Sequence, residues 1–372
     1  MKKIKICYIM NSFKNCGPCN IVLSMLRTID RKKFDVSLLT LLDDNDGEYI
    51  KILNKIDINV IKLNYPKSLK TFFKVSEIEK KIDNYNFDII HVHGQITAII
   101  LQNVQCYKVI TVHNKLYEDF KGLYGPIKGY LINHLYINAM KKFDRVISCS
   151  KTSYLVCKKY LKNCEFINNG IWFERKDKNQ LLKIKKEIRK ELNIPQNAKV
   201  YIFAGRYNNA KNVLTMLDFF SRTLKENEYL VSLGDGELYQ ECKKYNSKNI
   251  RQIGFKNNVQ DYMIASDIYV SFSYTEGFPV SIIEALHYGL TLLLSNIDSH
   301  IDIIDMGKDF YIGENFKNDD FNSFVEKKDL VSSKKLNGSI QFQNKYLSSE
   351  IMMDKYQQIY FSFFMSGCDK ND

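Results

Sequence analysis

Long apolar runs are missing from this chain of 372 residues. No stretch of about 18 uninterrupted apolar residues occurs, so the sequence predicts no transmembrane helix. The short apolar run at residues 6–10 is smaller than the core of a signal peptide, and no small-residue cleavage site follows it. We therefore expect a protein that remains in the cytoplasm.

Paired cysteines and arginine are also scarce. The nine cysteines are odd in number and lack the paired spacing of a disulfide framework, which favours a reduced, cytoplasmic protein. Arginine supplies only 8 of the 54 basic side chains, whereas proteins that read nucleic acids through bidentate contacts rely on it. Nucleic acid is therefore not an expected partner.

The positive charge that the chain does carry is unevenly distributed. Residues 1–172 hold 27 basic and 15 acidic side chains, and residues 173–372 hold 27 of each, so the first half carries the whole net charge of +12. The two halves should therefore face different partners. A basic surface suits an anionic membrane or a phosphorylated substrate.

Short apolar segments rich in Ile, Val and Tyr alternate with helical patterns along most of the chain. This alternation is typical of parallel sheets covered by helices on both faces. It restarts at residue 199, after a charged stretch at 173–196. The sequence predicts an α/β chain of two doubly wound, Rossmann-like domains, 1–172 and 173–347, with a cleft between them. A final helix within 348–372 should return to the first domain.

The expected elements follow from this periodicity. The strands are expected at 4–10, 35–40, 59–62, 89–93, 108–113 and 145–148, and then at 199–203, 229–233, 250–254 and 268–272. The helices are expected at 21–29, 74–84, 127–142, 213–223, 237–244, 259–265 and 348–364. One more helix should begin at Pro279, because proline suits the first helical position.

Two glutamates flank the start of that helix. Glu276 lies just outside its N-terminus, and Glu284 lies about one and a half turns inside it. Backbone N–H groups at such an end can bind a phosphate or sugar hydroxyls, and a carboxylate can accept hydrogen bonds from both hydroxyls of a diol. The pair therefore suggests an elongated polar ligand, although an ordinary solvent-facing glutamate fits the same pattern.

Three further strands end in glycine, charge or an aromatic residue. The carboxyl ends of parallel strands meet at one edge of the sheet, where open α/β folds bind ligands. Two cations at that edge would neutralise a leaving diphosphate. The residues concerned are Gly205, Arg206 and Lys211 after strand 199–203, Gly234 after strand 229–233, and Phe255 after strand 250–254.

This ordered set resembles glycosyltransferase family 4, the retaining nucleotide-sugar transferases of GT-B fold. The resemblance rests above all on the Glu-x7-Glu motif of Glu276 and Glu284, and it extends over nearly the whole chain, including segments 88–93, 111–113 and 168–170. It implies an acceptor-binding first domain and a donor-binding second domain. Within the family, bacterial transferases that build capsule, O-antigen and exopolysaccharide are the most similar in kind.

The resemblance implies roles for individual residues. Arg206 and Lys211 would hold the donor diphosphate and stabilise the leaving group, Glu284 would accept the ribose hydroxyls, and Glu276 would position the transferred sugar. The implied catalytic set is His113, Glu276, Arg206 and Lys211. The implied donor-binding set is Gly17, Gly205, Arg206, Lys211, Gly234, Phe255, Glu276, Gly277, Phe278, Pro279, Val280 and Glu284.

Two histidines at strand ends of the first domain complete the implied site. His113 would reach the sugar or the leaving phosphate, and both His93 and His113 are assigned to acceptor binding. A buried histidine with satisfied hydrogen bonds is the alternative for each, and for His93 the two alternatives are evenly matched.

The resemblance also implies the substrates. A hexose or N-acetylhexosamine would move from a nucleotide sugar, expected to be UDP-linked, to a lipid-linked saccharide, with retention and with neither metal nor cofactor. Segments 66–74 and 115–124 interleave lysine with aromatic residues, which suits an anionic membrane. We therefore expect peripheral binding at the inner face of the plasma membrane, with solvated surface helices as the alternative.

No cluster of histidines and carboxylates has convincing metal-ligand spacing. Asp44-Asn45-Asp46 matches the Asp-x-Asp of metal-dependent transferases, but it lies in a polar segment typical of a solvated turn. A calcium loop is excluded because Leu42 and Leu53 would occupy its first and twelfth ligand positions. We therefore expect no metal.

One segment departs from the family. Where consecutive glycines are usual after the first strand, the chain reads Cys16-Gly17-Pro18-Cys19, a motif also found in thioredoxin-like oxidoreductases. We expect a turn in which Gly17 allows close approach to the donor phosphate or acceptor. Three other functions stay open: a thiol oxidoreductase, a sugar-nucleotide epimerase of the same architecture, and a nucleotide-sugar-binding protein without catalysis.

Overall fold

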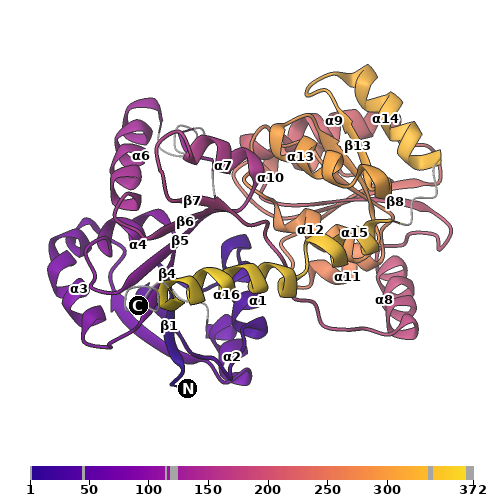
Figure 1. Cartoon of the computed structure of the whole chain (residues 1–372). Coiled ribbons are helices and arrows are strands. Elements are labelled where there is room, and N and C mark those ends of the chain that lie inside the picture. The colour runs from indigo at the N-terminus through magenta and orange to yellow at the C-terminus, as the bar shows by residue number, and fades with distance from the viewer. Residues whose placement is uncertain (1, 44–46, 114, 118–124, 334–337, 366–372) are drawn as a thin grey trace. The chain divides into compact units, whose positions relative to one another are not determined.

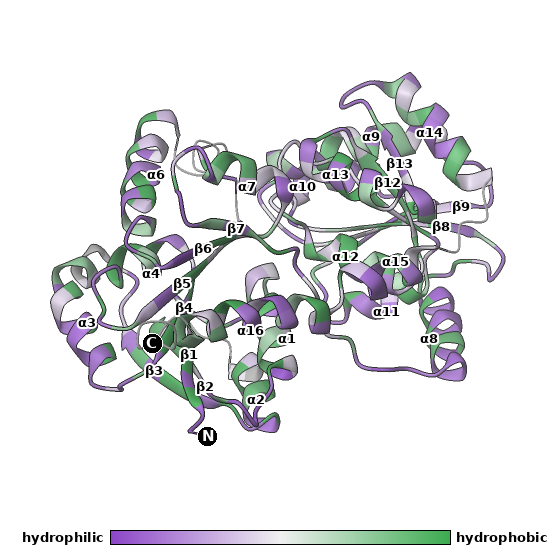
Figure 2. Ribbon diagram, in the orientation of Figure 1, coloured by the Kyte–Doolittle hydropathy of each residue, from purple (hydrophilic) through white to green (hydrophobic). Residues whose placement is uncertain are grey.

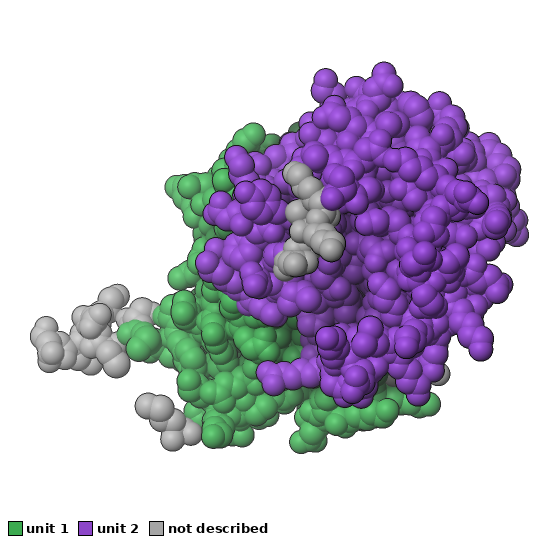
Figure 3. Space-filling view, turned by 90° about the vertical axis from the view of Figure 1, so that its right-hand side faces the viewer, with its two compact units in different colours: residues 1–172, 348–372 green, residues 173–347 purple. Residues whose placement is uncertain are grey.

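The structure, a computed structural model, describes residues 2–43, 47–113, 115–117, 125–333 and 338–365 (Figure 1). Hydrophobic and hydrophilic residues alternate along helices such as α8 (Lys178–Glu191), as expected for a helix that packs through one face (Figure 2). The chain divides into two compact units, coloured separately in Figure 3. Unit 1 comprises residues 1–172 and 348–372, and unit 2 comprises residues 173–347.

Unit 1 is built on a parallel sheet of seven described strands in the order β3-β2-β1-β4-β5-β6-β7. The strands are β1 (Ile4–Met10), β2 (Phe34–Leu42), β3 (Asn59–Tyr65), β4 (Ile89–His93), β5 (Tyr107–Val112), β6 (Arg145–Ser148) and β7 (Cys164–Phe166). The chain order reverses beside β1, which lies between β2 and β4. This is the strand order of a Rossmann-like sheet.

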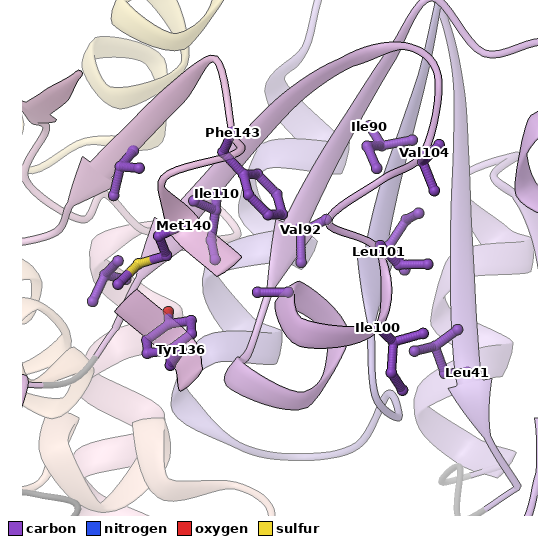
Figure 4. Packing of buried hydrophobic residues seen from close by; sticks show 14 of the residues in the cluster. Leu41, Ile90, Val92, Ile100, Leu101, Val104, Ile110, Tyr136, Met140 and Phe143 are labelled. Carbon is purple, nitrogen blue, oxygen red and sulfur yellow. The ribbon is translucent and has the colours of Figure 1, made fainter. Parts of the chain in front are cut away.

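Helices cover this sheet and bury its apolar side chains. They are α1 (Gly17–Thr28), α2 (Gly47–Lys55), α3 (Val75–Asp83), α4 (Gln95–Ile100), α6 (Pro126–Met140), α7 (Lys151–Cys157) and α16 (Ser349–Met365), with the 3-10 turn η1 (Leu69–Lys74). In one part of the core, Val92 and Ile110 of the sheet pack near Leu101, Tyr136 and Met140 (Figure 4). All five residues of β4 are buried, which fixes the position of the residues that follow it.

The C-terminal helix α16 belongs to unit 1 and brings two buried tyrosines to its sheet. The Tyr360 hydroxyl lies 2.7 Å from His91 Nδ1 and 3.1 Å from the Tyr8 hydroxyl. The Tyr356 hydroxyl lies 2.8 Å from Thr111 Oγ1, which in turn lies 2.8 Å from His91 Nε2. A continuous buried hydrogen-bond network therefore joins the last helix to β1, β4 and β5.

Unit 2 repeats the architecture with six described parallel strands in the order β10-β9-β8-β11-β12-β13. The strands are β8 (Lys199–Ala204), β9 (Glu228–Leu233), β10 (Ile250–Gly254), β11 (Ile268–Ser271), β12 (Thr291–Ser295) and β13 (Gly313–Phe316). The helices, besides α8, are α9 (Val213–Thr223), α10 (Tyr239–Cys242), α11 (Val259–Ile264), α12 (Val280–His287), α13 (Asp298–Met306), α14 (Phe321–Ser333) and α15 (Ser339–Tyr346). The 3-10 turns are η2 (Asn209–Lys211), η3 (Lys243–Tyr245) and η4 (Lys308–Phe310).

The predicted fold class of two Rossmann-like α/β domains is confirmed, while several element boundaries differ. The helix expected from residue 21 begins at Gly17, since Pro18 is tolerated in a first helical turn. The helix expected at 237–244 is divided into α10 and η3. Strand β7 was not expected, because its three residues lie half-buried or exposed at the sheet edge and show no apolar pattern.

No helix within the described ranges is both long enough and apolar enough to cross a membrane. The longest of these helices, α16, buries Tyr356, Tyr360 and Phe363 in unit 1, whereas Phe364 is 42% exposed.

Candidate functional site

Each sheet offers a ligand-binding position where its strand order reverses. That point lies between β1 and β4 in unit 1 and between β8 and β11 in unit 2. Open α/β sheets bind ligands at the carboxyl ends of the strands there. We call residues 205–211 and 273–276 of unit 2 the charged edge, and His93 with His113 of unit 1 the histidine edge.

Local backbone structure places Lys211 at the charged edge. The side chain of Asn208 accepts a hydrogen bond of 3.1 Å from the Lys211 N–H and thereby caps the turn η2. Asn212 then adopts a left-handed conformation with φ of 50°, which ends the turn before α9 begins. The carbonyl of Ala210 accepts a 2.9 Å hydrogen bond from the Tyr274 N–H, so the loops that follow β8 and β11 are joined directly.

The centre of the charged edge is an ion pair. The Lys211 ammonium donates to Glu276 Oε1, and the Ser273 hydroxyl donates to the same oxygen at 2.8 Å. The Lys211 side chain is 25% exposed and that of Glu276 is 13% exposed. Burial raises the pKa of Glu276, but the Lys211 charge and these hydrogen bonds outweigh it and hold the pKa below its ordinary value. Glu276 is thus a fixed anion, and Lys211 keeps a partly accessible positive charge.

Glu284 lies on α12 in a different environment. Its side chain is half-buried, and its carboxylate has no hydrogen-bond partner among the described residues. Burial raises its pKa to about 7. An acceptor that lacks a partner and ionises near neutral pH is available for donors on a ligand, such as hydroxyl groups.

The segment between these two glutamates forms the start of α12. Pro279, expected as the first helical residue, is instead the residue before it, because its ψ of 122° is extended. Phe278 and Pro279 are buried, whereas Gly277 and Val280 are half-buried. The first turn of a helix has N–H groups without intrahelical partners, so the predicted use of this end for an oxygen ligand remains geometrically possible.

The glycines at the ends of β8 and β9 have a packing function. A Cβ on Gly234, whose φ is +133°, would lie 1.8 Å from the carbonyl oxygen of Gly205. The Gly205 N–H bonds the Leu233 carbonyl at 3.1 Å, and the Gly234 N–H bonds the Gly254 carbonyl at 2.9 Å. The ends of β8, β9 and β10 are therefore tied together by backbone, and the donor contacts predicted for Gly205 and Gly234 stay predictions.

Two side chains beside these strand ends are open to solvent. Arg206 is exposed and makes no ion pair with any described residue. Phe255, directly after β10, is 61% exposed. Arg206 follows β8 and Phe255 follows β10, with β9 between these two strands. An exposed cation and an exposed aromatic ring at strand ends of one sheet suit a phosphate and a base, as the sequence predicts for them.

The histidine edge is neutral and largely buried. His93 Nδ1 lies 2.8 Å from His113 Nε2, and the two rings stack with centroids 5.2 Å apart. His113 is half-buried, and burial lowers its pKa to about 4. His93 is only 2% exposed, so protein covers most of its ring, and the acceptor contact implied for it stays a prediction.

The loop after β1 also differs from the expectation. Gly17 is the first residue of α1 and is not part of a turn, and Cys16 occupies the position before the helix. The Cys16 and Cys19 sulfur atoms lie 3.0 Å apart, with Cys16 exposed and Cys19 buried. Contact with Cys16 and burial both raise the pKa of Cys19, so this thiol stays protonated at neutral pH.

Two residues beside Glu276 were not assigned roles from the sequence. Ser273 stands three residues before Glu276, a spacing that allows a side-chain hydrogen bond and could have identified it. His300 is fully buried on α13, interacts electrostatically with Glu276, and has a pKa lowered to about 4 mainly by burial. His300 gives no sequence signal, because 24 residues separate it from Glu276.

Two predicted segments fall partly or wholly outside the described residues. Asp44-Asn45-Asp46 lies outside them, as do residues 118–124 of the basic segment 115–124. Across the part of the chain that is described, no group of three His, Cys, Asp or Glu side chains is placed to hold a metal ion.

Comparison with known proteins identifies the class defined by this fold and site. The model of glycosyl transferases group 1 matches residues 184–338, and that of glycosyltransferase family 4 matches residues 18–175. The chain is thus a glycosyltransferase of GT-B fold. Its first half carries a glycosyltransferase family 4 domain, and its second half carries a glycosyl transferases group 1 domain.

The relatives are similar over most of their length. The Escherichia coli O-antigen biosynthesis glycosyltransferase WclY is 26% identical over 97% of this chain and 99% of its own. The Escherichia coli UDP-Gal:alpha-D-GlcNAc-diphosphoundecaprenol alpha-1,3-galactosyltransferase is 27% identical over 87% and 86%. The crystal structure of Anabaena HepE with UDP and glucose matches with a TM-score of 0.79 at 14% identity, over 96% of this chain and 100% of that one.

Proposed function

We propose that this protein transfers a hexose or N-acetylhexosamine from a UDP-sugar to a lipid-linked saccharide, with retention, in the synthesis of O-antigen or capsule. The observation that carries the proposal is the charged edge, where Lys211 and Glu276 form a largely buried ion pair at the reversal point of the unit 2 sheet. The relatives support the substrate classes, since one is named for UDP-galactose and a diphosphoundecaprenol-linked acceptor.

The residues would divide the reaction between them. The bond from sugar C1 to the diphosphate oxygen breaks, the acceptor oxygen bonds to C1, and its proton leaves with the nucleoside diphosphate. Lys211 and exposed Arg206 would stabilise the negative charge that develops on the leaving group. Glu276 orients Lys211 and would bind sugar hydroxyls with its second oxygen, while Glu284 would accept the ribose hydroxyls.

The chemistry proposed for these residues uses no metal or other cofactor. Two protein cations stand where charge appears on the diphosphate, which is the function that a divalent ion would otherwise serve. Retention would leave the new linkage in the anomeric configuration of the donor.

The proposal is tested by ligand binding followed by turnover. A thermal-shift panel of nucleotide sugars should show one donor that stabilises the protein, by about 2.7 kcal/mol at a hundredfold excess over its Kd. That donor should then yield UDP and a retained product with a diphosphoundecaprenol-linked sugar, in the presence of EDTA. Binding without turnover on any acceptor would favour a non-catalytic nucleotide-sugar-binding protein, and interconversion of UDP-sugars would favour an epimerase.

We further propose that unit 1 contacts an anionic membrane, where a lipid-linked acceptor would lie. In segment 66–74, Phe73 is 89% exposed and Lys67 and Lys74 are exposed. On α6, the apolar side chains Ile127 and Leu131 are 77% and 57% exposed, next to exposed Lys128. Exposed apolar and aromatic side chains beside lysines are typical of interfacial membrane binding.

Liposome co-sedimentation tests this contact. The protein should bind anionic vesicles at low salt and ignore neutral ones, and Phe73→Ser with Leu131→Ser should weaken the binding. The matched control is Tyr311→Ser, which removes an aromatic side chain that is 66% exposed on unit 2. Equal binding of neutral and anionic vesicles, or none to either, would exclude the proposal.

A further inference from the structure

The two histidines of the histidine edge share a hydrogen bond. Which ring donates it determines whether Nδ1 of His113 carries a proton. His93 ends β4, and His113 directly follows β5. The 2.8 Å contact joins His93 Nδ1 to His113 Nε2 and requires one proton between them. Both rings are neutral at pH 7, because burial lowers the pKa of each below its ordinary value.

The far nitrogen of His93 restricts where that proton resides. His93 Nε2 is buried and has no hydrogen-bond partner among the described residues. Neighbouring His91, with its ring centroid 4.3 Å from that of His93, already uses both of its nitrogens on Tyr360 and Thr111. No described group therefore accepts a proton from His93 Nε2.

Two arrangements of protons are possible for the neutral pair. If His113 Nε2–H donates, His93 must carry its own proton on Nε2, as a buried N–H without an acceptor. If His93 Nδ1–H donates, His93 Nε2 is a bare lone pair, and His113 carries its proton on Nδ1. Buried N–H groups without an acceptor are rarer in proteins than under-satisfied buried acceptors, and such a donor loses its hydrogen bond to water without compensation, so the second arrangement is favoured.

We infer that His93 is a positioning residue that holds His113 in the tautomer with its proton on Nδ1. His113 Nδ1 makes no hydrogen bond to any described residue, and the side chain is half-buried. His113 therefore presents an N–H donor, which suits an oxygen acceptor such as a sugar hydroxyl or a phosphate oxygen. It does not present a lone pair, so it is not a general base. The role in transfer rests on the proposed function, whereas the tautomer does not.

Nitrogen-15 NMR of the full chain tests the tautomer directly. The chain has six histidines, and His113→Gln identifies the His113 signals. Long-range correlations should show a protonated Nδ1 and a bare Nε2 on His113, although free histidine prefers the opposite tautomer. His93→Leu should return His113 to the Nε2–H form, while His134→Gln, an exposed control on α6, should leave it unchanged. A wild-type His113 protonated on Nε2 would overturn the inference, whatever the result with His93→Leu.

Kinetics test the positioning role. His93→Leu should lower kcat about tenfold, whereas His93→Asn, whose amide nitrogen can donate from the position of Nδ1, should recover most of it with similar thermal stability. Equal kcat in wild type and His93→Leu, with the tautomer changed, would remove the role in transfer. If the wild type turned over no UDP-sugar while NMR showed Nδ1–H, the proposed function would fail and the tautomer assignment would stand.

Discussion

The six strands of the unit 2 sheet have the same order as the first six strands of unit 1, but the two ligand-binding edges differ in charge. Residues 1–172 carry the whole net charge of +12, yet the histidine edge of unit 1 is neutral and hydrogen-bonded. Unit 2, residues 173–347, is nearly balanced with 25 basic and 23 acidic side chains, yet it keeps a largely buried ion pair at its edge. Net charge therefore describes the surface of a domain and says little about its site.

The largest effect is expected when the charged side chains at the edge of unit 2 are removed. Lys211→Ala and Glu276→Ala should each reduce kcat/KM at least tenfold, since one loses a cation for the leaving group and the other loses its orientation. The control Lys225→Ala removes an exposed ion pair with Asp329 and should leave the rate unchanged. Near-normal rates for both variants, measured as UDP release, would refute the role of the charged edge.

The backbone support of the charged edge should matter nearly as much. Gly234→Ala places a Cβ 1.8 Å from the Gly205 carbonyl at a positive φ, so we expect a loss of more than about 2 kcal/mol in the free energy of unfolding. Gly47→Ala, where a Cβ meets nothing within 4 Å, is the control. Urea unfolding of both variants checks this, and equal midpoints would show that the strand ends can separate without cost.

A pH profile separates the contribution of Glu284 in unit 2 from that of the histidine edge in unit 1. Glu284, with a pKa of about 7, should bind ribose hydroxyls as the anion, so donor affinity should rise about tenfold from pH 6 to pH 8. His113, with a pKa of about 4, stays neutral over that range and should add no slope. Isothermal titration of wild type and Glu284→Gln measures this; a slope that survives in the variant would assign the titration to another group.

The raised pKa of Glu284 also predicts how the free energy of unfolding changes with pH. Because the folded-state pKa of Glu284 lies above its ordinary value of 4.5, the folded state binds more protons between pH 4.5 and 7. Its contribution to the stability of the ligand-free protein is therefore largest below that window and is lost as the pH rises through 7. Glu284→Gln should lack this component of the pH dependence in thermal unfolding.

The smallest effect is expected at the cysteines of unit 1. Cys16→Ser with Cys19→Ser should keep at least about half of the transfer rate, since this pair lies at the start of α1 and the proposed chemistry uses no thiol. Loss of activity in this variant, with the fold retained by circular dichroism, would support the thiol oxidoreductase alternative.

The sequence predicts most of the fold because parallel strands are buried on both faces and therefore read as apolar runs. Strands β1, β4, β6 and β10 have the predicted bounds. The charged residues at strand ends were also predictable, since they follow those runs directly. Contacts between distant segments could not be predicted from the sequence. The hydrogen bond between Thr111 and Tyr356, for example, joins residues that are 245 positions apart. The burial of His93 depends on such contacts and could not be predicted from the sequence.

The buried tyrosines of α16 affect how unit 1 can fold during translation. Residues 1–172 are synthesised first, but His91 and Thr111 reach their hydroxyl partners only when Tyr356 and Tyr360 have emerged. Unit 2 is by then fully translated, because it ends at residue 347. Unit 1 is thus the first part of the chain to be translated, but it cannot complete its hydrogen-bond network until all of unit 2 has been translated.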